Sequence, residues 1–254
     1  WRSAVTPKDF STIHSDYAFF EAHSTEARRD AEGYLSGLRR FDQEPTLDWL
    51  DFGCGDGAFT GKLLTMLRPS PQRLRLSLVE PDTDYRESAL VHLQSFTGHT
   101  IAAWPILPEQ AIRQYDLALA NHVLYYVPEL RLAVQQIAQS LKPTGSFFTA
   151  MAGRENALMH LWTASFEILG KALPYHSSED LEQILGELAL PYRKWPVDYV
   201  IRFDDSEQNR LHLLRFVFAD HFDDDHRSQL LGLLEPYRLG REIVIETSHA
   251  QYQI

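Results

Sequence analysis

The length, composition and charge of this chain exclude several classes of protein. Its 254 residues, 44% of them hydrophobic, can bury the core of one large domain, or of one domain with a smaller lobe. A formal net charge of −11 repels phosphate backbones, so nucleic acid is excluded as the expected partner, whereas small cationic molecules are compatible.

The single cysteine and the lack of long apolar runs describe the setting in which the protein works. Because Cys54 has no second cysteine to pair with, an intrachain disulfide and a thiolate metal cluster are excluded, which predicts a reducing, cytoplasmic compartment. No apolar run approaches membrane-spanning length, so no membrane partner is expected. The chain begins at Trp1 rather than Met, so we expect residues upstream of it, and a removed targeting segment stays an open alternative.

Residues 1–45 are expected to form a helical cover. The pattern over residues 9–42 is helical, and Ser24 is placed to cap one of its helices. The apolar face of that helix consists of Ala27, Ala31, Tyr34, Leu35 and Leu38.

Residues 46–151 alternate between strand and helix patterns and form the predicted cofactor-binding core. Strands are expected at 47–52, 74–80, 100–103, 115–120 and 145–151. A helix from Leu130 to Leu141 is expected to end at Lys142-Pro143-Thr144-Gly145. Such alternation predicts an α/β fold with a mostly parallel sheet and helices on both faces. Ligands of such sheets bind at the carboxyl ends of the strands.

The segment from Asp51 to Gly57, DFGCGDG, is the most informative motif. An apolar strand leads into Gly53, Gly55 and Gly57, and an amphipathic helix pattern follows at once. This is a turn in which a ligand can approach the backbone closely, in front of a helix N-terminus. The next strand ends in Glu80, whose carboxylate can accept hydrogen bonds from both hydroxyls of a ribose.

The spacing of these glycines separates two classes of nucleotide site. Dinucleotide enzymes use G-x-G-x-x-G to bring a diphosphate onto the helix, whereas this turn reads G-x-G-x-G. Asp51 and Asp56 would repel a diphosphate and suit the ammonium group of a methionine moiety. The turn resembles the S-adenosylmethionine site of class I methyltransferases; a strand-turn-helix corner without a ligand is the alternative.

Two further segments complete the predicted fold. Residues 152–192 are expected to form a helical insert that serves as a substrate lobe, with a capping box of Ser177 and Asp180 at its second helix. Residues 193–254 are expected to complete the sheet. They contribute strands at 194–203 and 241–247 and helices at 206–221 and 224–235, which gives a seven-stranded, Rossmann-like sheet.

Short segments spread over nearly the whole chain resemble histamine N-methyltransferases. The most distinctive are His23-Ser24-Thr25-Glu26 and Leu124-Tyr125-Tyr126-Val127. The other matching segments are Val79-Glu80-Pro81, Ala103-Trp104, Leu161-Trp162, Ser178-Glu179-Asp180-Leu181 and the last strand around Thr247. The resemblance implies S-adenosylmethionine as cofactor, held by Gly53, Gly55, Gly57 and Glu80, with Pro81 beside Glu80.

The resemblance also implies a substrate site for a basic small molecule. Glu26 would contact that substrate, and its aromatic walls would be Tyr17, Tyr125, Tyr126 and Trp162. Two positions depart from the family: His122 replaces a substrate-contacting glutamine, and Glu246 replaces an asparagine of the last strand. These departures favour an amine related to histamine over histamine itself. A solvent-exposed Glu246 is the alternative.

Methyl transfer needs alignment, a dry site and a destination for one proton. Glu26 is expected to pair with an ammonium or an imidazole N–H, unless it only stabilises the first turn of its helix. His122 follows the fourth strand and is either the proton acceptor, a neutral group that orients the substrate, or a packed polar residue. Asn121, just before it, can reach the cofactor.

No metal ion is expected. Six histidines show no spacing to a second ligand that would indicate a metal site: His92, His99, His160, His212, His221 and His226. The clustered acids of magnesium-dependent catechol methyltransferases have no counterpart.

The sequence therefore predicts an S-adenosylmethionine-dependent N-methyltransferase for a small amine or imidazole-type metabolite. An O-methyltransferase for a small hydroxylated or carboxylic metabolite is one alternative, because this fold carries both chemistries. A catalytically idle cofactor-binding module is the other. A monomer is compatible with the sequence, which leaves the oligomeric state open.

Overall fold

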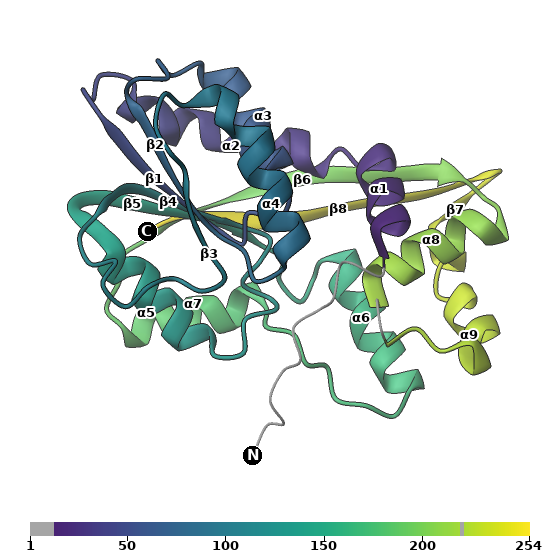
Figure 1. The fold of residues 1–254 in the computed structure, drawn as a ribbon. Helices are drawn as coiled ribbons and strands as arrows, with labels where there is room; N and C mark the ends of the chain where they lie inside the picture. Colours follow the sequence, from purple (N-terminus) through teal and green to yellow (C-terminus); the bar gives the residue numbers. More distant parts are fainter. Residues whose placement is uncertain (1–12, 219–220) are drawn as a thin grey trace.

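A mixed, mostly parallel sheet runs through the centre of the molecule (Figure 1). The structure, a computed structural model, describes residues 13–218 and 221–254, so residues 9–12 and 219–220 of the predicted helices lie outside the described range. Seven strands follow the order β3-β2-β1-β4-β5-β8-β6, which confirms the predicted seven-stranded sheet. The first five of these are parallel to one another, whereas β8 pairs antiparallel with both β5 and β6.

The strands extend over β1 Leu47–Phe52, β2 Leu74–Val79, β3 Ala102–Trp104, β4 Tyr115–Asn121, β5 Leu141–Met151, β6 Arg193–Asp204 and β8 Glu242–Gln253. The short strand β7, Arg238–Leu239, pairs with β8 outside this path. Consecutive residues of the central strands face opposite cores, as pleating requires. Trp49 of β1 packs with the helices of one face, and Leu50 packs with those of the other.

Helices cover both faces of the sheet, as predicted (Figure 1). One face carries α2 Glu26–Leu38, α3 Ala58–Leu67 and α4 Thr83–Leu93, and the other carries α5 Leu130–Ser140 and α7 Ser178–Glu187. The predicted apolar face of α2 buries Ala31, Tyr34 and Leu38. Helix α7 begins with the predicted capping box of Ser177 and Asp180.

A second group of helices packs around the far end of the long β6–β8 ribbon (Figure 1). It consists of α1 His14–His23, α6 Ala157–Ile168, α8 Glu207–Phe218 and α9 Arg227–Gly232. The predicted N-terminal cover and the predicted 152–192 insert are therefore each divided. One helix of each, α1 and α6, joins this group, whereas α2 and α7 pack on the sheet.

Three predicted boundaries are wrong. The last strand does not end at 247 but continues to Gln253, because its second half pairs with β5 and β6. Residues 142–145 lie within β5, since Leu141 already pairs with Tyr115. The helix predicted over 224–235 is divided into η5 Asp224–His226, α9 and η6 Glu235–Tyr237; short η2 Arg39–Phe41 and η3 Gln94–Phe96 also occur.

The capping role of Ser24 also differs from the prediction. Thr25 is the N-cap residue of α2, and the Ser24 hydroxyl accepts a hydrogen bond from the backbone N–H of Glu26 at 3.1 Å. Within residues 13–218 and 221–254, no helix is both long enough and apolar enough to cross a membrane.

Candidate active site

The glycine turn between β1 and α3 has the backbone geometry that its sequence predicts. Gly53 and Gly55 have φ angles of +73° and +53°, in the left-handed region that favours glycine. A Cβ atom at Gly53 would overlap the side chain of Val123, just after β4. At Gly55 no described heavy atom lies within 4 Å of the Cβ position, so that side of the turn leaves room for a ligand.

Glu80 lies directly against this turn. One of its carboxylate oxygens accepts from the backbone N–H of Gly55 and the other from that of Asp82, both at 3.0 Å. Burial raises the pKa of Glu80, and the two N–H donors oppose that rise. The structure thus brings Glu80 to the glycine turn, as predicted, with the exposed Pro81 next to it.

Asp51 and Cys54 are the buried side chains of the glycine turn. Asp51 is 4% exposed and accepts a hydrogen bond of 2.6 Å from the Thr60 hydroxyl, and burial raises its pKa to about 7. The pKa of the Cys54 thiol is also raised, mostly by burial and further by the negative charges of Asp51 and Glu80. A buried, protonated thiol agrees with the expected role of Cys54 as a small packing residue.

The end of β4 places two predicted residues side by side. The amide oxygen of Asn121 accepts from the Tyr34 hydroxyl at 2.9 Å, so its side chain is directed to α2. His122 has a φ of +52°, which is uncommon for a residue with a side chain and is found at functional sites. The turn conformation directs the His122 ring to α2 as well, where it meets Asp30.

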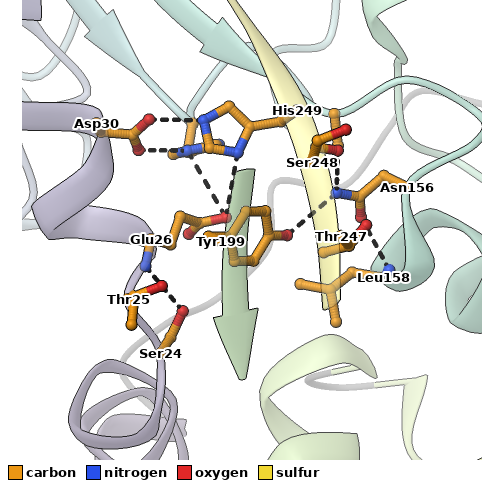
Figure 2. A network of polar contacts seen from close by, with 12 residues as sticks. Ser24, Thr25, Glu26, Asp30, Asn156, Leu158, Tyr199, Thr247, Ser248 and His249 are labelled. Atoms are coloured by element: carbon orange, nitrogen blue, oxygen red, sulfur yellow. Dashed lines mark hydrogen bonds and ion pairs between the residues drawn. The ribbon is translucent and has the colours of Figure 1, made fainter. Parts of the chain in front are cut away.

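Asp30 binds two imidazole rings with one carboxylate (Figure 2). Nε2 of His122 donates to Oδ2 at 2.8 Å, and Nε2 of His249 donates to Oδ1 at 2.6 Å. The side-chain amide of Gln251 adds a hydrogen bond to Oδ1 at 2.9 Å. Burial alone would raise the pKa of Asp30, but the two histidines outweigh burial and lower it, so Asp30 is a carboxylate at neutral pH.

Glu26 lies one helical turn before Asp30 and faces the same two rings (Figure 2). Its Oε1 is 3.8 Å from Nε2 of His122 and 3.7 Å from Nδ1 of His249. Burial would lower the pKa of His122, but Glu26 and Asp30 raise it to about 9. His122 is therefore cationic at neutral pH, which favours an orienting role for it over that of proton acceptor.

An aromatic cluster adjoins His122. The Tyr125 ring stacks on it at a centroid distance of 6.1 Å, and the Tyr125 hydroxyl is 3.2 Å from its Nδ1. Tyr126, Trp162 and Tyr175 continue the cluster, with centroid distances between 4.6 and 6.3 Å. The structure thus brings Tyr125, Tyr126 and Trp162 together, as the resemblance implied.

Tyr17 is a half-buried residue of α1. After burial, the groups that raise its pKa are Glu21, Asp56 of the glycine turn and Glu26 of the polar cluster. Its ring contacts Phe216 of α8, at a centroid distance of 5.8 Å. The role of Tyr17 as an aromatic wall of the substrate site stays a prediction.

Glu246 does not join the cluster. It is exposed on β8, and side chains of a strand alternate between the two faces, so it points away from Thr247, His249 and Gln251. The exposed position matches the alternative of a solvent-exposed Glu246, and its substrate contact stays a prediction; His249 is a β8 side chain that reaches Glu26.

The sequence analysis missed two residues that contact Glu26 or His122 directly, Asp30 and His249. It also missed two residues of the surrounding hydrogen-bond network, Asn156 and Gln251. The Asn156 amide donates to the Tyr199 hydroxyl at 3.1 Å and to the backbone oxygen of Ser248 at 2.8 Å, which ties the start of α6 to β6 and β8. Asp30 follows Glu26 by four residues, and this helical spacing was a usable signal. The signal for His249 and Gln251 was weaker: they follow Thr247 by two and four residues, which places all three on the same face of a strand.

Comparisons with known proteins agree with this geometry. A family model described as a methyltransferase domain matches residues 26–190. Among solved structures, the YcgJ protein of Bacillus subtilis has a TM-score of 0.57 at 15% identity, over 87% of this chain and 97% of that chain. A Thermotoga maritima methyltransferase, described as a possible histamine N-methyltransferase, has a TM-score of 0.53 at 14% identity, over 96% and 95%.

The plantazolicin methyltransferase BpumL, solved with S-adenosylhomocysteine, has a TM-score of 0.53 at 12% identity, covering 94% of this chain and 89% of that chain. At such identities these structures show a common fold and no more. No curated protein matches the sequence. The family match spans well over half of the chain, so this protein belongs to the methyltransferase domain family and is a class I methyltransferase with S-adenosylmethionine as its cofactor.

Proposed function

We propose that this enzyme transfers the methyl group of S-adenosylmethionine to a nitrogen atom of a small amine or imidazole-type metabolite. The observation that carries the proposal is the polar cluster of Glu26, Asp30, His122 and His249 at the carboxyl end of β4. The cluster lies beside the cofactor turn, because Val123 packs on Gly53 while the preceding residue, His122, contacts Asp30.

The charges of the cluster favour a basic acceptor. Two carboxylates, Glu26 and Asp30, face one cationic imidazole, His122, whose pKa is raised to about 9. The side chain of Asp30 is fully buried, whereas that of Glu26 keeps 14% of its surface exposed. Glu26 is therefore the carboxylate that an ammonium or imidazole N–H can reach, with the neighbouring aromatic rings as walls for a cation.

The reaction is an in-line displacement. The nitrogen lone pair forms a bond to the methyl carbon while the C–S bond breaks and its electrons return to sulfur, which gives neutral S-adenosylhomocysteine. The nitrogen then loses one proton, and Glu26 is the candidate acceptor, since its side chain keeps 14% of its surface exposed. The residues supply alignment and a dry site, since the sulfonium is already an activated donor.

The test is release of S-adenosylhomocysteine by the purified protein with a panel of acceptors, read together with product masses. The panel holds histamine, histidine, other imidazoles, simple amines, catechols and short acids. We expect turnover with an imidazole or an amine, lost in Glu26→Gln with cofactor affinity unchanged. Turnover confined to catechols or acids would instead establish an O-methyltransferase. Cofactor binding without turnover on any acceptor would indicate an idle binding module.

A further inference from the structure

Three metal-binding side chains converge in the polar cluster, from three segments far apart in the chain. Glu26 comes from α2, His122 from the turn after β4 and His249 from β8, and their ligand atoms all lie within 4.8 Å of one another. The six histidines considered from sequence spacing are not among them. His122 and His249 are paired only by the fold.

The separations are those of ligands around one ion. Glu26 Oε1 lies 3.8 Å from His122 Nε2 and 3.7 Å from His249 Nδ1. Ligand atoms bonded to a tetrahedral ion at ~2.0–2.2 Å lie about 3.3–3.6 Å apart, so the separations of 3.7 and 3.8 Å are close to those of ligands around one ion.

The ring nitrogen of His249 supplies an independent observation. Its side chain has no exposed surface, and Nδ1 has no hydrogen-bond partner among the residues that the structure describes. Buried polar atoms are normally satisfied, so an orphan of this kind needs an explanation. Nε2 of the same ring donates to Asp30, which leaves a lone pair on Nδ1 directed at the gap beside Glu26.

The surroundings of this nitrogen match those of metal-bound histidines. Such rings usually donate their second N–H to a carboxylate, which fixes the tautomer and raises the basicity of the ligating nitrogen. Asp30 does this for His249, and Gln251 holds the Asp30 carboxylate in place. For His122, an ion would replace both the proton on Nε2 and the 2.8 Å hydrogen bond that this N–H now donates to Asp30.

We propose that Glu26, His122 and His249 bind one divalent transition-metal ion, with Asp30 as the residue that positions the His249 ring. Two histidines and one carboxylate leave coordination positions open, as in catalytic sites of this type. The acceptor would then coordinate the ion through a nitrogen or oxygen atom other than the nitrogen that receives the methyl group, so that this nitrogen keeps its lone pair for the attack. This inference builds on the proposed function and adds the requirement that the acceptor is a metal ligand.

Metal binding is measured directly on the full chain. Protein freed of metal by chelation is titrated separately with Zn²⁺, Mn²⁺ and Co²⁺ by calorimetry, and the absorption spectrum of bound Co²⁺ reports its coordination. We expect one ion per chain, with affinity lowered more than tenfold in Glu26→Gln and in His249→Gln. Asp30→Asn should weaken binding by about 10–100-fold without removing a ligand. His226→Asn, which alters an exposed His–Asp pair, is the matched control and should bind as wild type.

The proposal is overturned if wild-type protein binds no ion stoichiometrically, or if Glu26→Gln and His249→Gln bind as tightly as wild type. Cofactor affinity, measured on the same samples, shows that each variant is folded. Turnover by chelated protein that binds no ion would refute the metal site and leave the methyl transfer intact. An ion bound at these residues, without turnover on any acceptor, would confirm the site and refute the proposed function.

Discussion

The cofactor turn and the polar cluster lie next to each other but are encoded in different ways. Most of the turn is contained in seven consecutive residues, Asp51 to Gly57, and backbone atoms shape it. The cluster consists of side chains from α2, the turn after β4 and β8, and its hydrogen-bonded partners lie up to 221 positions apart in the sequence. A ligand site made of backbone can be recognised in sequence, whereas one made of distant side chains requires the fold.

The largest expected effect tests whether Asp30 holds the cluster together. In Asp30→Asn the cationic His122 loses its buried carboxylate, and breaking such a buried pair costs about 3–5 kcal/mol. We expect the free energy of unfolding in urea to fall by that amount, with cofactor binding retained in the folded fraction. Asp223→Asn, in a solvent-exposed His–Asp pair, should leave the free energy of unfolding nearly unchanged. Equal losses of unfolding free energy in the two variants would show that the Asp30–His122 pair contributes no more to stability than an exposed ion pair.

The cofactor side has its own stability signature, in the dependence on pH. The folded-state pKa of Asp51, about 7, is above that of an unfolded aspartate, so the folded protein holds a proton that the unfolded chain releases. The contribution of Asp51 to stability is fully present below pH 4 and decreases as the pH rises to about 7. We expect this decrease to amount to roughly 2–4 kcal/mol and to vanish in Asp51→Asn.

The pH experiment needs a control for the remaining carboxylates. Asp198 is exposed on β6, and Asp198→Asn should reproduce the wild-type dependence between pH 4 and pH 7. Chemical unfolding of the three proteins across this range gives the comparison. A wild-type slope in Asp51→Asn would show that Asp51 is ionised in the folded protein.

The functional separation of the two regions is tested at Glu26. We expect Glu26→Gln to lower kcat about 100-fold, equivalent to ~2.7 kcal/mol, because the neutral amide cannot compensate a cationic acceptor. Cofactor affinity, measured by calorimetry, should change by less than twofold. A comparable loss of cofactor affinity in Glu26→Gln would contradict this separation, because it would show that Glu26 also contributes to cofactor binding.

The converse substitution is made in the glycine turn. Gly55→Ala places a methyl group where no described atom lies within 4 Å, so the protein should fold but lose at least tenfold in cofactor affinity, about 1.4 kcal/mol. Gly240→Ala has the same positive φ and the same open surroundings far from the turn, so it controls for backbone strain. Cofactor affinity that falls equally in both variants would assign the effect to strain.

The smallest effect is expected at Glu246. It is exposed and points away from His249, so Glu246→Gln should leave kcat and KM within twofold of wild type. In contrast, His249→Gln should lower kcat at least tenfold. A larger effect at Glu246 than at His249 would restore the original interpretation of the last strand.

The same contrast between local patterns and distant side chains explains which parts of the fold and of the site could be predicted from the sequence. Glycine spacing, apolar strands and the acid after β2 predicted the sheet and the cofactor turn with Glu80 beside it, because each is a local pattern; the hydrogen bond from Gly55 to Glu80 emerged only from the structure. Glu26, His122 and the aromatic residues came from a resemblance to a family. His249 was missed because the strand was predicted to end at residue 247, and Asp30 because an acid in an amphipathic helix is normally exposed.

The β6–β8 ribbon has a mechanical consequence. Its register runs without a break from the Arg193–Gln253 pair to the Asp204–Glu242 pair, and His249 lies within it, opposite Val197. This continuous ladder connects the helices at its far end to the sheet at its near end. The imidazole of His249 lies between the two ends. We expect an acceptor to gain access through movement of the helices, because the pairing of β6 with β8 is continuous along the whole ribbon.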